Sequence, residues 1–449
     1  MPEEQIIAEP KLNEQPPRIG PIRRLRWHRR RPNRLLLLLA VLGPGLVSAA
    51  AGDDAGGIAT YSQAGASYGY SLLWIVVVIT ISLGVVQEMC ARMGAITQKG
   101  LADLIREEFG VRWTAFAMLC LLIANGSTVV TEFLGIKASI QVLAGDDTWL
   151  VYPIVPLVAF GVWWLVIKGS YRRIEKVFLL MALVLISYIP AAFLAKPDWG
   201  EVLRQTIIPS FSLTGGYIAI FVATIGTTIT PYMQVYVQSA VADKGIQPKD
   251  YAYEVVDVYS SSIFGNLISF FIIVATGATL FVNHISVNSA EDAARALEPF
   301  AGPYAKVLFS IGLFGASMLA AAVLPLSTSY ALCEAFGFER GVSRSFKEAP
   351  VFQSIFTSLI IIAIIIALIP NLPIISVLIN LQILDAVLLP VLLIFILRLV
   401  NNRRLMGSYT NGRVYNVVAW ATTVAVSTMA ILYIFFSLVL PLFGVNIGG

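Results

Sequence analysis

A carboxylate lies in the middle of the first long apolar segment of this chain. Asp54 stands within the run AGDDAGG at residues 51–57. A charged side chain at mid-membrane costs about 3 kcal/mol or more, so it usually marks an ion or proton site. The surrounding glycines favour a helix break that frees backbone carbonyl groups beside the acid, as in many cation-binding secondary transporters. For Asp53, binding to the water shell of a cation and pairing with a donor both remain open.

A second break is predicted in segment 213–241, which reads TTITPYMQ at residues 227–234. Pro231 removes a backbone donor and disfavours helix at Thr230, and the neighbouring threonines add hydroxyl groups. The alternative is an ordinary kink whose threonines bond back to their own helix. Because the two breaks fall at matching positions of two five-span blocks, they indicate the binding site of an inverted-repeat transporter.

Composition places both breaks in a polytopic α-helical membrane protein. The chain has 449 residues, of which 57% are hydrophobic and only 13% are charged, and its apolar segments are long enough to cross ~30 Å of hydrocarbon. The three cysteines have neither disulfide nor zinc spacing, and no His, Ser and Cys constellation indicates an enzyme. The predicted spans are 35–62, 70–93, 112–142, 150–168, 175–196, 213–241, 257–283, 303–334, 351–369, 373–399 and 414–442.

The distribution of Lys and Arg residues indicates how the chain is oriented in the membrane. With the N-terminus in the cytoplasm, 26 of the 31 Lys and Arg residues fall in cytoplasmic segments and four in external loops. This imbalance predicts a plasma-membrane protein with a cytoplasmic N-terminus and an external C-terminus. The Arg-rich residues 1–34 run directly into the first span, so no cleavable signal peptide is expected. They are interpreted as a topology anchor that touches anionic lipid, not as a nucleic-acid site.

Several short motifs resemble the Nramp family of divalent-metal transporters. They are GPG at 43–45, DAGG at 54–57, QAGA at 63–66, ARMG at 91–94, EFLG at 132–135 and TPYM at 230–233. The resemblance implies the amino acid–polyamine–organocation (leucine-transporter-like) fold, with two inverted five-helix repeats plus an eleventh helix. The implied organisation is a basic tail 1–34, a first repeat 35–196, an external linker 197–212, a second repeat 213–399, and residues 400–449 with the eleventh span.

The resemblance also implies a set of metal ligands, and this chain departs from it. Asp54 matches the family's aspartate, next to Ala55, and Thr227 matches a carbonyl donor. Gly57 stands where the family has an asparagine, and Thr230 stands where it has a methionine. Soft sulfur favours manganese and iron, whereas an oxygen-only, widened site suits Mg²⁺, which keeps several of its waters. This set of residues at the ligand positions is similar to that of the Nramp-related magnesium transporters.

Proton coupling is also affected by these departures. Where the family has a histidine in the sixth span the chain has Tyr232, which keeps its proton near neutral pH. Three positions before the third-span glutamate, the family often has an acidic residue, but this chain has Val129. Only Glu132 therefore remains of that acidic pair. Lys137, on a similar face of the same span, could pair with Glu132. The resemblance to the magnesium branch implies transport without obligatory protons.

Other polar residues lie within the spans. Met233 stands at the position of a family asparagine and is interpreted as packing. Gln382 matches a family glutamine near the ion in one conformational state. For Asp385, a role around the ion or its gate and a structural hydrogen bond are equally open. Glu88 and Arg92 are spaced for an i,i+4 ion pair.

The sequence therefore predicts Mg²⁺ uptake, with Mn²⁺ as a second substrate, by a monomeric transport unit without a cofactor. One alternative is a proton-coupled Mn²⁺/Fe²⁺ transporter. Another is an organic-solute transporter of the same fold, against which Asp54 argues because it repels a substrate carboxylate. A non-transporting magnesium sensor is disfavoured because no soluble regulatory domain is present.

Overall fold

The computed structural model of the chain describes residues 54–145, 148–168, 171–246, 248, 251–341 and 346–439. Within these ranges every regular element is helical, as the composition predicts. The basic tail and residues 35–53 of the predicted first span, which include Asp53 and the GPG motif, lie outside the described residues.

The longer helices follow the predicted spans, and short helices join them. Their bounds are α2 Ala55–Tyr68, α3 Leu73–Thr97, α4 Leu101–Phe109, α5 Val111–Ala144, α6 Val151–Ile167, α7 Tyr171–Ala182, α8 Tyr188–Leu194, α9 Trp199–Ile207, α10 Gly215–Thr228, α11 Pro231–Asp243, α12 Tyr251–Thr276, α13 Ala290–Ala294, α14 Glu298–Ala301, α15 Ala305–Phe336, α16 Pro350–Ala367, α17 Ile374–Val400, α18 Arg403–Met406 and α19 Arg413–Ile434. A 3₁₀ turn, Leu183–Ser187, joins α7 to α8, and a π turn, Gly277–Phe281, extends α12.

Nine helical segments in the described ranges are long and apolar enough to cross a bilayer, and α6 is a shorter apolar helix. Their outward faces carry large apolar side chains. Ile81 is 56% exposed, Leu157 68% and Ile365 62%. Contiguous exposed apolar surface of this kind is rare in soluble monomers and is expected where helices contact lipid. Two boundaries differ from the prediction by six residues: α2 continues to Tyr68 rather than ending at residue 62, and α12 begins at Tyr251 rather than at residue 257.

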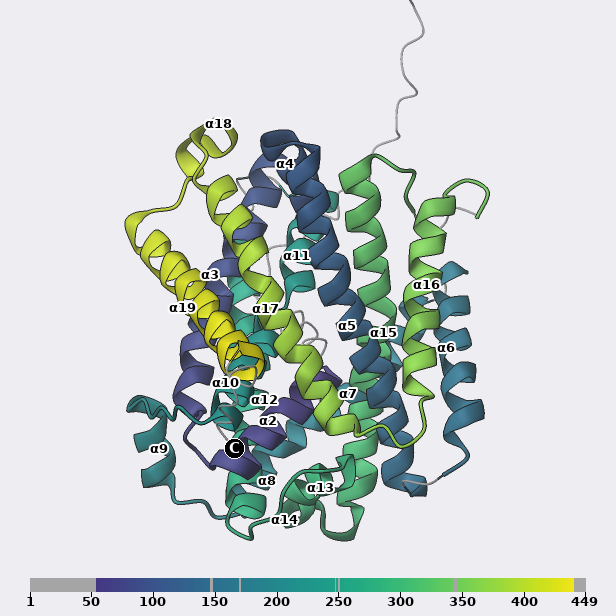
Figure 1. The fold of residues 1–449 in the computed structure, drawn as a ribbon, viewed down its shortest axis with the longest axis vertical. Helices are drawn as coiled ribbons and strands as arrows, with labels where there is room; N and C mark the ends of the chain where they lie inside the picture. The colour runs from purple at the N-terminus through teal and green to yellow at the C-terminus, as the bar shows by residue number, and fades with distance from the viewer. Residues whose placement is uncertain are drawn as a thin grey trace, which may run out of the picture. The chain divides into compact units, whose positions relative to one another are not determined.

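The short helix α2 lies at the centre of the helix packing, in contact with α5, α10, α12 and α17. Helix α17 also packs against α10, and α11 packs against α3. In Figure 1, α4 and α18 lie at one end of the helices, and α9, α13 and α14 lie at the other. Close approach depends on small residues: a Cβ at Gly226 of α10 would lie 2.0 Å from the backbone oxygen of Gln382 in α17.

Candidate functional site

Helix α2 begins immediately after Asp54, whose side chain caps it. The backbone of Asp54 is extended, and its Oδ1 accepts a hydrogen bond of 2.6 Å from the N–H of Gly57. A carboxylate at this position satisfies a helix-end donor and is stabilised by the positive end of the helix dipole. Asp54 is only 1% exposed, and its Oδ2 has no hydrogen-bond partner. The second oxygen is thus a buried, negatively charged acceptor that is free to bind a cation.

The predicted break in the sixth span is confirmed. Helix α10 ends at Thr228, Ile229 leaves helical geometry, and Thr230 is extended before Pro231 begins α11. Because proline has no N–H, the carbonyl of Thr227 lacks its usual helical donor. The carboxyl end of α10 also carries the negative end of its helix dipole. The hydroxyl oxygen of Thr230 is buried without a partner.

The two helix ends meet at Thr227. Its hydroxyl lies 3.5 Å from Oδ1 of Asp54, at the limit of a hydrogen bond. Gly57 lies against the same pair, since a Cβ there would be 3.0 Å from the Thr227 hydroxyl and 3.1 Å from Oδ1 of Asp54. A hydrogen bond of 2.7 Å between Tyr61 and Thr228 joins the same helices. Asp54, Gly57 and Thr227 are therefore brought together, whereas Thr230 makes no hydrogen bond to Asp54.

Gln382 reaches this site from α17. A Cβ at Gly56 would lie 1.7 Å from its Nε2, so the amide sits directly against the first turn of α2. Both polar atoms of Gln382 are buried and have no hydrogen-bond partner. Unpaired buried polar groups are costly, and their presence next to Asp54 indicates a place where a hydrated ligand supplies the missing bonds.

Glu132 approaches the start of α2 from α5. Its Oε1 accepts a hydrogen bond of 3.1 Å from the Thr131 hydroxyl. The other oxygen, Oε2, is buried without a partner. The expected pairing of Lys137 with Glu132 is wrong, because Lys137 instead donates to the carbonyl of Ile369 at 3.0 Å. That carbonyl follows the last turn of α16, where a cation is favoured by the helix dipole.

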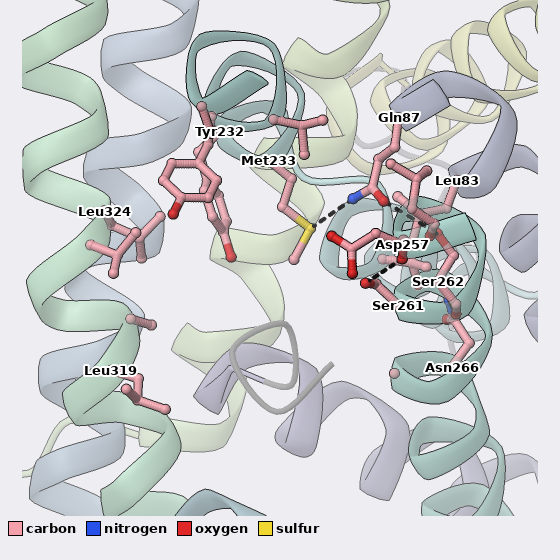
Figure 2. A pocket seen from close by; sticks show the side chains of 18 of the residues that line it. Leu83, Gln87, Tyr232, Met233, Asp257, Ser261, Ser262, Asn266, Leu319 and Leu324 are labelled. Atoms are coloured by element: carbon pink, nitrogen blue, oxygen red, sulfur yellow. Dashed lines mark hydrogen bonds between the residues drawn. The ribbon is translucent and has the colours of Figure 1, made fainter. Parts of the chain in front are cut away.

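Two predicted residues line a cavity next to the break. Tyr232 and Met233 face a space of about 280 Å³ that also reaches Thr227 (Figure 2). Tyr232 is buried, but Met233 is only half-buried, and its sulfur accepts a hydrogen bond from Gln87 at 3.7 Å. Met233 therefore contributes to a cavity wall as well as to packing.

Asp385, Glu88 and Arg92 have structural partners within the membrane-spanning helices. Both oxygens of Asp385 are bonded, to Ser127 at 2.9 Å and to Thr128 at 2.8 Å. This favours the structural alternative for Asp385. The ion pair predicted between Glu88 and Arg92 is confirmed, at 3.1 Å.

No cluster of three or more His, Cys, Asp or Glu side chains suited to a metal occurs among the described residues. Hydropathy and motif spacing do not single out the polar residues of α12 that line the cavity. Their spacing of three to four residues in an apolar helix is a signal that could have revealed them.

Comparison with known proteins agrees with this geometry. The sequence profile described as Nramp, natural resistance-associated macrophage protein-like, matches residues 45–436. The chain belongs to the Nramp family. A relative named divalent metal cation transporter MntH, from Bacillus subtilis, is 25% identical over 88% of this chain and 92% of its own length. This Nramp protein is thus a multi-pass membrane transporter and not an enzyme, as the sequence indicates.

Solved structures agree on the fold. A mutant of the manganese transporter of Eremococcus coleocola superposes with a TM-score of 0.74 at 19% identity, covering 93% of this chain and 90% of that one. A nucleobase-cation-symport-1 family transporter superposes with a TM-score of 0.54 at 15% identity, covering 89% and 90%. The predicted leucine-transporter-like, all-helical fold is therefore confirmed for this Nramp protein.

Proposed function

We propose that this Nramp protein transports divalent cations, with Mg²⁺ as its main substrate and Mn²⁺ as a second one. The carrying observation is a pair of buried oxygens without partners, Oδ2 of Asp54 and the hydroxyl of Thr230, at the two helix breaks. The carbonyl of Thr227 adds a third oxygen without its helical donor. Hard oxygen ligands with a single carboxylate suit Mg²⁺, which loses water reluctantly and keeps several waters when bound.

The absence of a side chain at Gly57 supports this proposal. A larger residue there would crowd the site, because a Cβ would already lie 3.0 Å from the Thr227 hydroxyl and 3.1 Å from Oδ1 of Asp54. The unpaired amide of Gln382 lies on the other side of the first turn of α2, where it can bond to retained waters. A site that binds an ion with part of its water shell distinguishes weakly between Mg²⁺ and Mn²⁺, because few protein ligands contact the metal directly. Mn²⁺ is therefore proposed as a second substrate.

Transport is proposed to run without obligatory protons. Tyr232 replaces an imidazole that would titrate near neutral pH, and Val129 replaces an acid. An inside-negative potential supplies about 4.6 kcal/mol per 100 mV for a divalent cation, enough for a concentration ratio of more than about 10³. With the orientation predicted from positive charge, this drives uptake into the cytoplasm. One chain supplies both helix breaks, so the transport unit is proposed to be a monomer.

The competing function is proton-coupled Mn²⁺ transport. Oε2 of Glu132, buried without a partner, favours it because such an oxygen can accept a proton. The solved relative from Eremococcus coleocola is named a manganese transporter, which supports Mn²⁺ as the substrate in this alternative.

The test uses proteoliposomes that contain a Mg²⁺-sensitive dye and a pH dye, with an inside-negative potential. Addition of external Mg²⁺ should raise the Mg²⁺ signal without acidification, and Asp54→Ala should abolish it. Asp385→Asn serves as a control, because this carboxylate is equally buried but fully bonded. Silence with Mg²⁺ together with acidification on adding Mn²⁺ would refute the magnesium proposal and establish the competing one.

A further inference from the structure

The polar side chains of α12 lie along one stripe that faces the cavity. They recur every three to four residues, which places them on one side of a helix. The apolar residues Val256, Ile263 and Leu267 are outwardly exposed, at 50%, 55% and 39%. The stripe consists of Glu254, Asp257, Ser261, Ser262, Asn266 and Ser269.

The cavity connects this stripe to the candidate site. Its lining includes Thr227 at the helix break and Lys244 just after α11. The cavity thus extends from the break along α11 and α12 toward the end of the helices where α11 ends. Figure 2 shows the carboxylate of Asp257 projecting from α12 toward the sulfur of Met233, with Gln87 above them. The wall is completed on the other side by apolar residues of α15 such as Leu319 and Leu324.

Hydrogen bonds within α12 do not account for the whole stripe. Ser261 bonds to the backbone oxygen of Asp257 at 2.7 Å, and Ser262 bonds to Val258 at 2.9 Å and to Gln87 at 3.2 Å. In contrast, the carboxylate of Asp257 has neither an ion pair nor a hydrogen bond to another described residue. Asn266, only 6% exposed, donates to Ser262 but its Oδ1 has no partner among the described residues. An unpaired carboxylate and a free amide oxygen remain on the cavity wall.

The charges that face Asp257 leave the stripe negative. Glu254 lies one turn earlier on α12, and Lys244 faces both acids from the end of α11, with Nζ 4.0 Å from Glu254. The side chain of Lys244 is 60% exposed, so this ion pair is weak. Two carboxylates against one ammonium group attract cations to the cavity and repel anions.

We propose that this stripe is the aqueous path between the Asp54–Thr227 site and the membrane surface, and that Asp257 is a second, transient binding site on it for a hydrated divalent cation. The inference rests on the proposed transport function. Ionisable side chains in membrane helices commonly mark ion paths, because the charge is otherwise costly to keep there. Hydroxyl and amide groups at one-turn intervals can replace the outer waters of a cation as it moves. Asp257 would bind the ion through the waters of its hydration shell, a mode of binding for which one carboxylate is sufficient.

The test labels the stripe chemically in the full-length protein. Ser261→Cys introduces a thiol on the cavity wall, and Ser260→Cys introduces one at a neighbouring position that does not line the cavity. The native cysteines are buried, so the wild-type protein supplies the background rate. A cationic thiol reagent should modify the Ser261→Cys variant faster than an anionic reagent of similar size. Millimolar Mn²⁺ or Mg²⁺ should slow that reaction and leave the Ser260→Cys variant unaffected.

Asp257 is tested by a pair of substitutions in the Ser261→Cys background. Asp257→Asn should reduce the preference for the cationic reagent about fivefold and remove protection by Mn²⁺, because a unit charge is lost within a few ångströms of the thiol. Asp257→Glu keeps the charge and should keep both effects. Equal rates for the two reagents, with no Mn²⁺ protection, would overturn the proposal.

Uptake measurements on the same variants separate the two proposals. If Mn²⁺ or Mg²⁺ uptake persists while the Ser261→Cys variant shows neither charge preference nor protection, the path along α12 is wrong and the transport function stands. If the cation protects the thiol but wild-type protein transports neither ion, the site on α12 stands and the proposed transport function fails.

Discussion

Replacing Asp54 by asparagine should abolish cation binding while leaving the protein folded. Asparagine keeps the oxygen that accepts the 2.6 Å hydrogen bond from Gly57. It removes the negative charge and places an NH₂ group where Oδ2 has no partner. Asparagine and aspartate cap helices about equally well, whereas alanine at such a position costs about 1 kcal/mol. The two substitutions thus separate the charge of Asp54 from its role in capping α2.

The size of the effect follows from the charge. A carboxylate and a divalent cation ~4 Å apart attract each other by about 2 kcal/mol in water and about 8 kcal/mol in a medium with an effective dielectric constant of 20. The smaller figure already corresponds to a loss of about thirtyfold in affinity. Because Asp54 is 1% exposed, the larger figure is the closer one, and binding should fall below detection.

Isothermal titration with Mn²⁺ and Mg²⁺ in detergent measures the affinity, and thermal unfolding of the same samples measures stability. Asp54→Asn should show no binding and an unfolding temperature close to that of the wild type. Asp54→Ala should show no binding and a lower unfolding temperature. Binding by Asp54→Asn within about threefold of the wild-type affinity would refute the assignment of Asp54 as the essential charge. Equal destabilisation by both substitutions would refute the capping argument.

Three further predictions follow from particular contacts. Gly226→Ala should destabilise the protein, because its Cβ would lie 2.0 Å from a backbone oxygen of α17. The control variant Gly161→Ala meets no atom within 4 Å and should stabilise the protein by up to about 1 kcal/mol, because alanine favours helix more than glycine does. Thermal unfolding measures both effects. Thr230→Met combined with Gly57→Asn should restore a soft ligand set and raise affinity for Cd²⁺ relative to Mg²⁺ by at least about tenfold in competition assays; unchanged selectivity would assign it to the backbone instead. Asp385→Ala should lower the free energy of unfolding by about 1–3 kcal/mol yet leave Mg²⁺ affinity nearly unchanged, and loss of binding would place Asp385 at the ion.

Much of the fold could be predicted from hydropathy. The apolar segments are continuous and long, so most of the second to eleventh spans agree with helices within a few residues, although α12 begins six residues before the predicted seventh span. Their ends are less predictable, because capping residues rather than hydropathy decide them. Tyr68 remains helical beyond the predicted boundary until Gly69 ends α2 with a positive φ of 57°. The short helices α9, α13 and α14 carry too little apolar sequence to be recognised from hydropathy.

The site could be predicted in part. Pro231 and the glycines after Asp54 indicate the breaks, since both residue types act on the backbone of their own segment. The partners of the charged residues could not be predicted this way. Lys137 was expected to pair with Glu132 because both lie on α5, yet its ammonium group reaches a carbonyl of a different helix. Such pairing depends on which helices pack together.

Local sequence is enough to show that the chain is a membrane protein with two interrupted spans and a carboxylate in one of them. These properties depend on local chemistry: hydrophobicity over about 20 residues, a missing proline N–H and a buried charge. Three features emerge only from helix packing. Thr227 lies 3.5 Å from Asp54, Gln382 lies without partners against the first turn of α2, and the polar residues of α12 line a cavity leading to the break. These contacts join residues on different helices, the first two of them more than 100 positions apart, and helix packing through glycines such as Gly226 sets their distance.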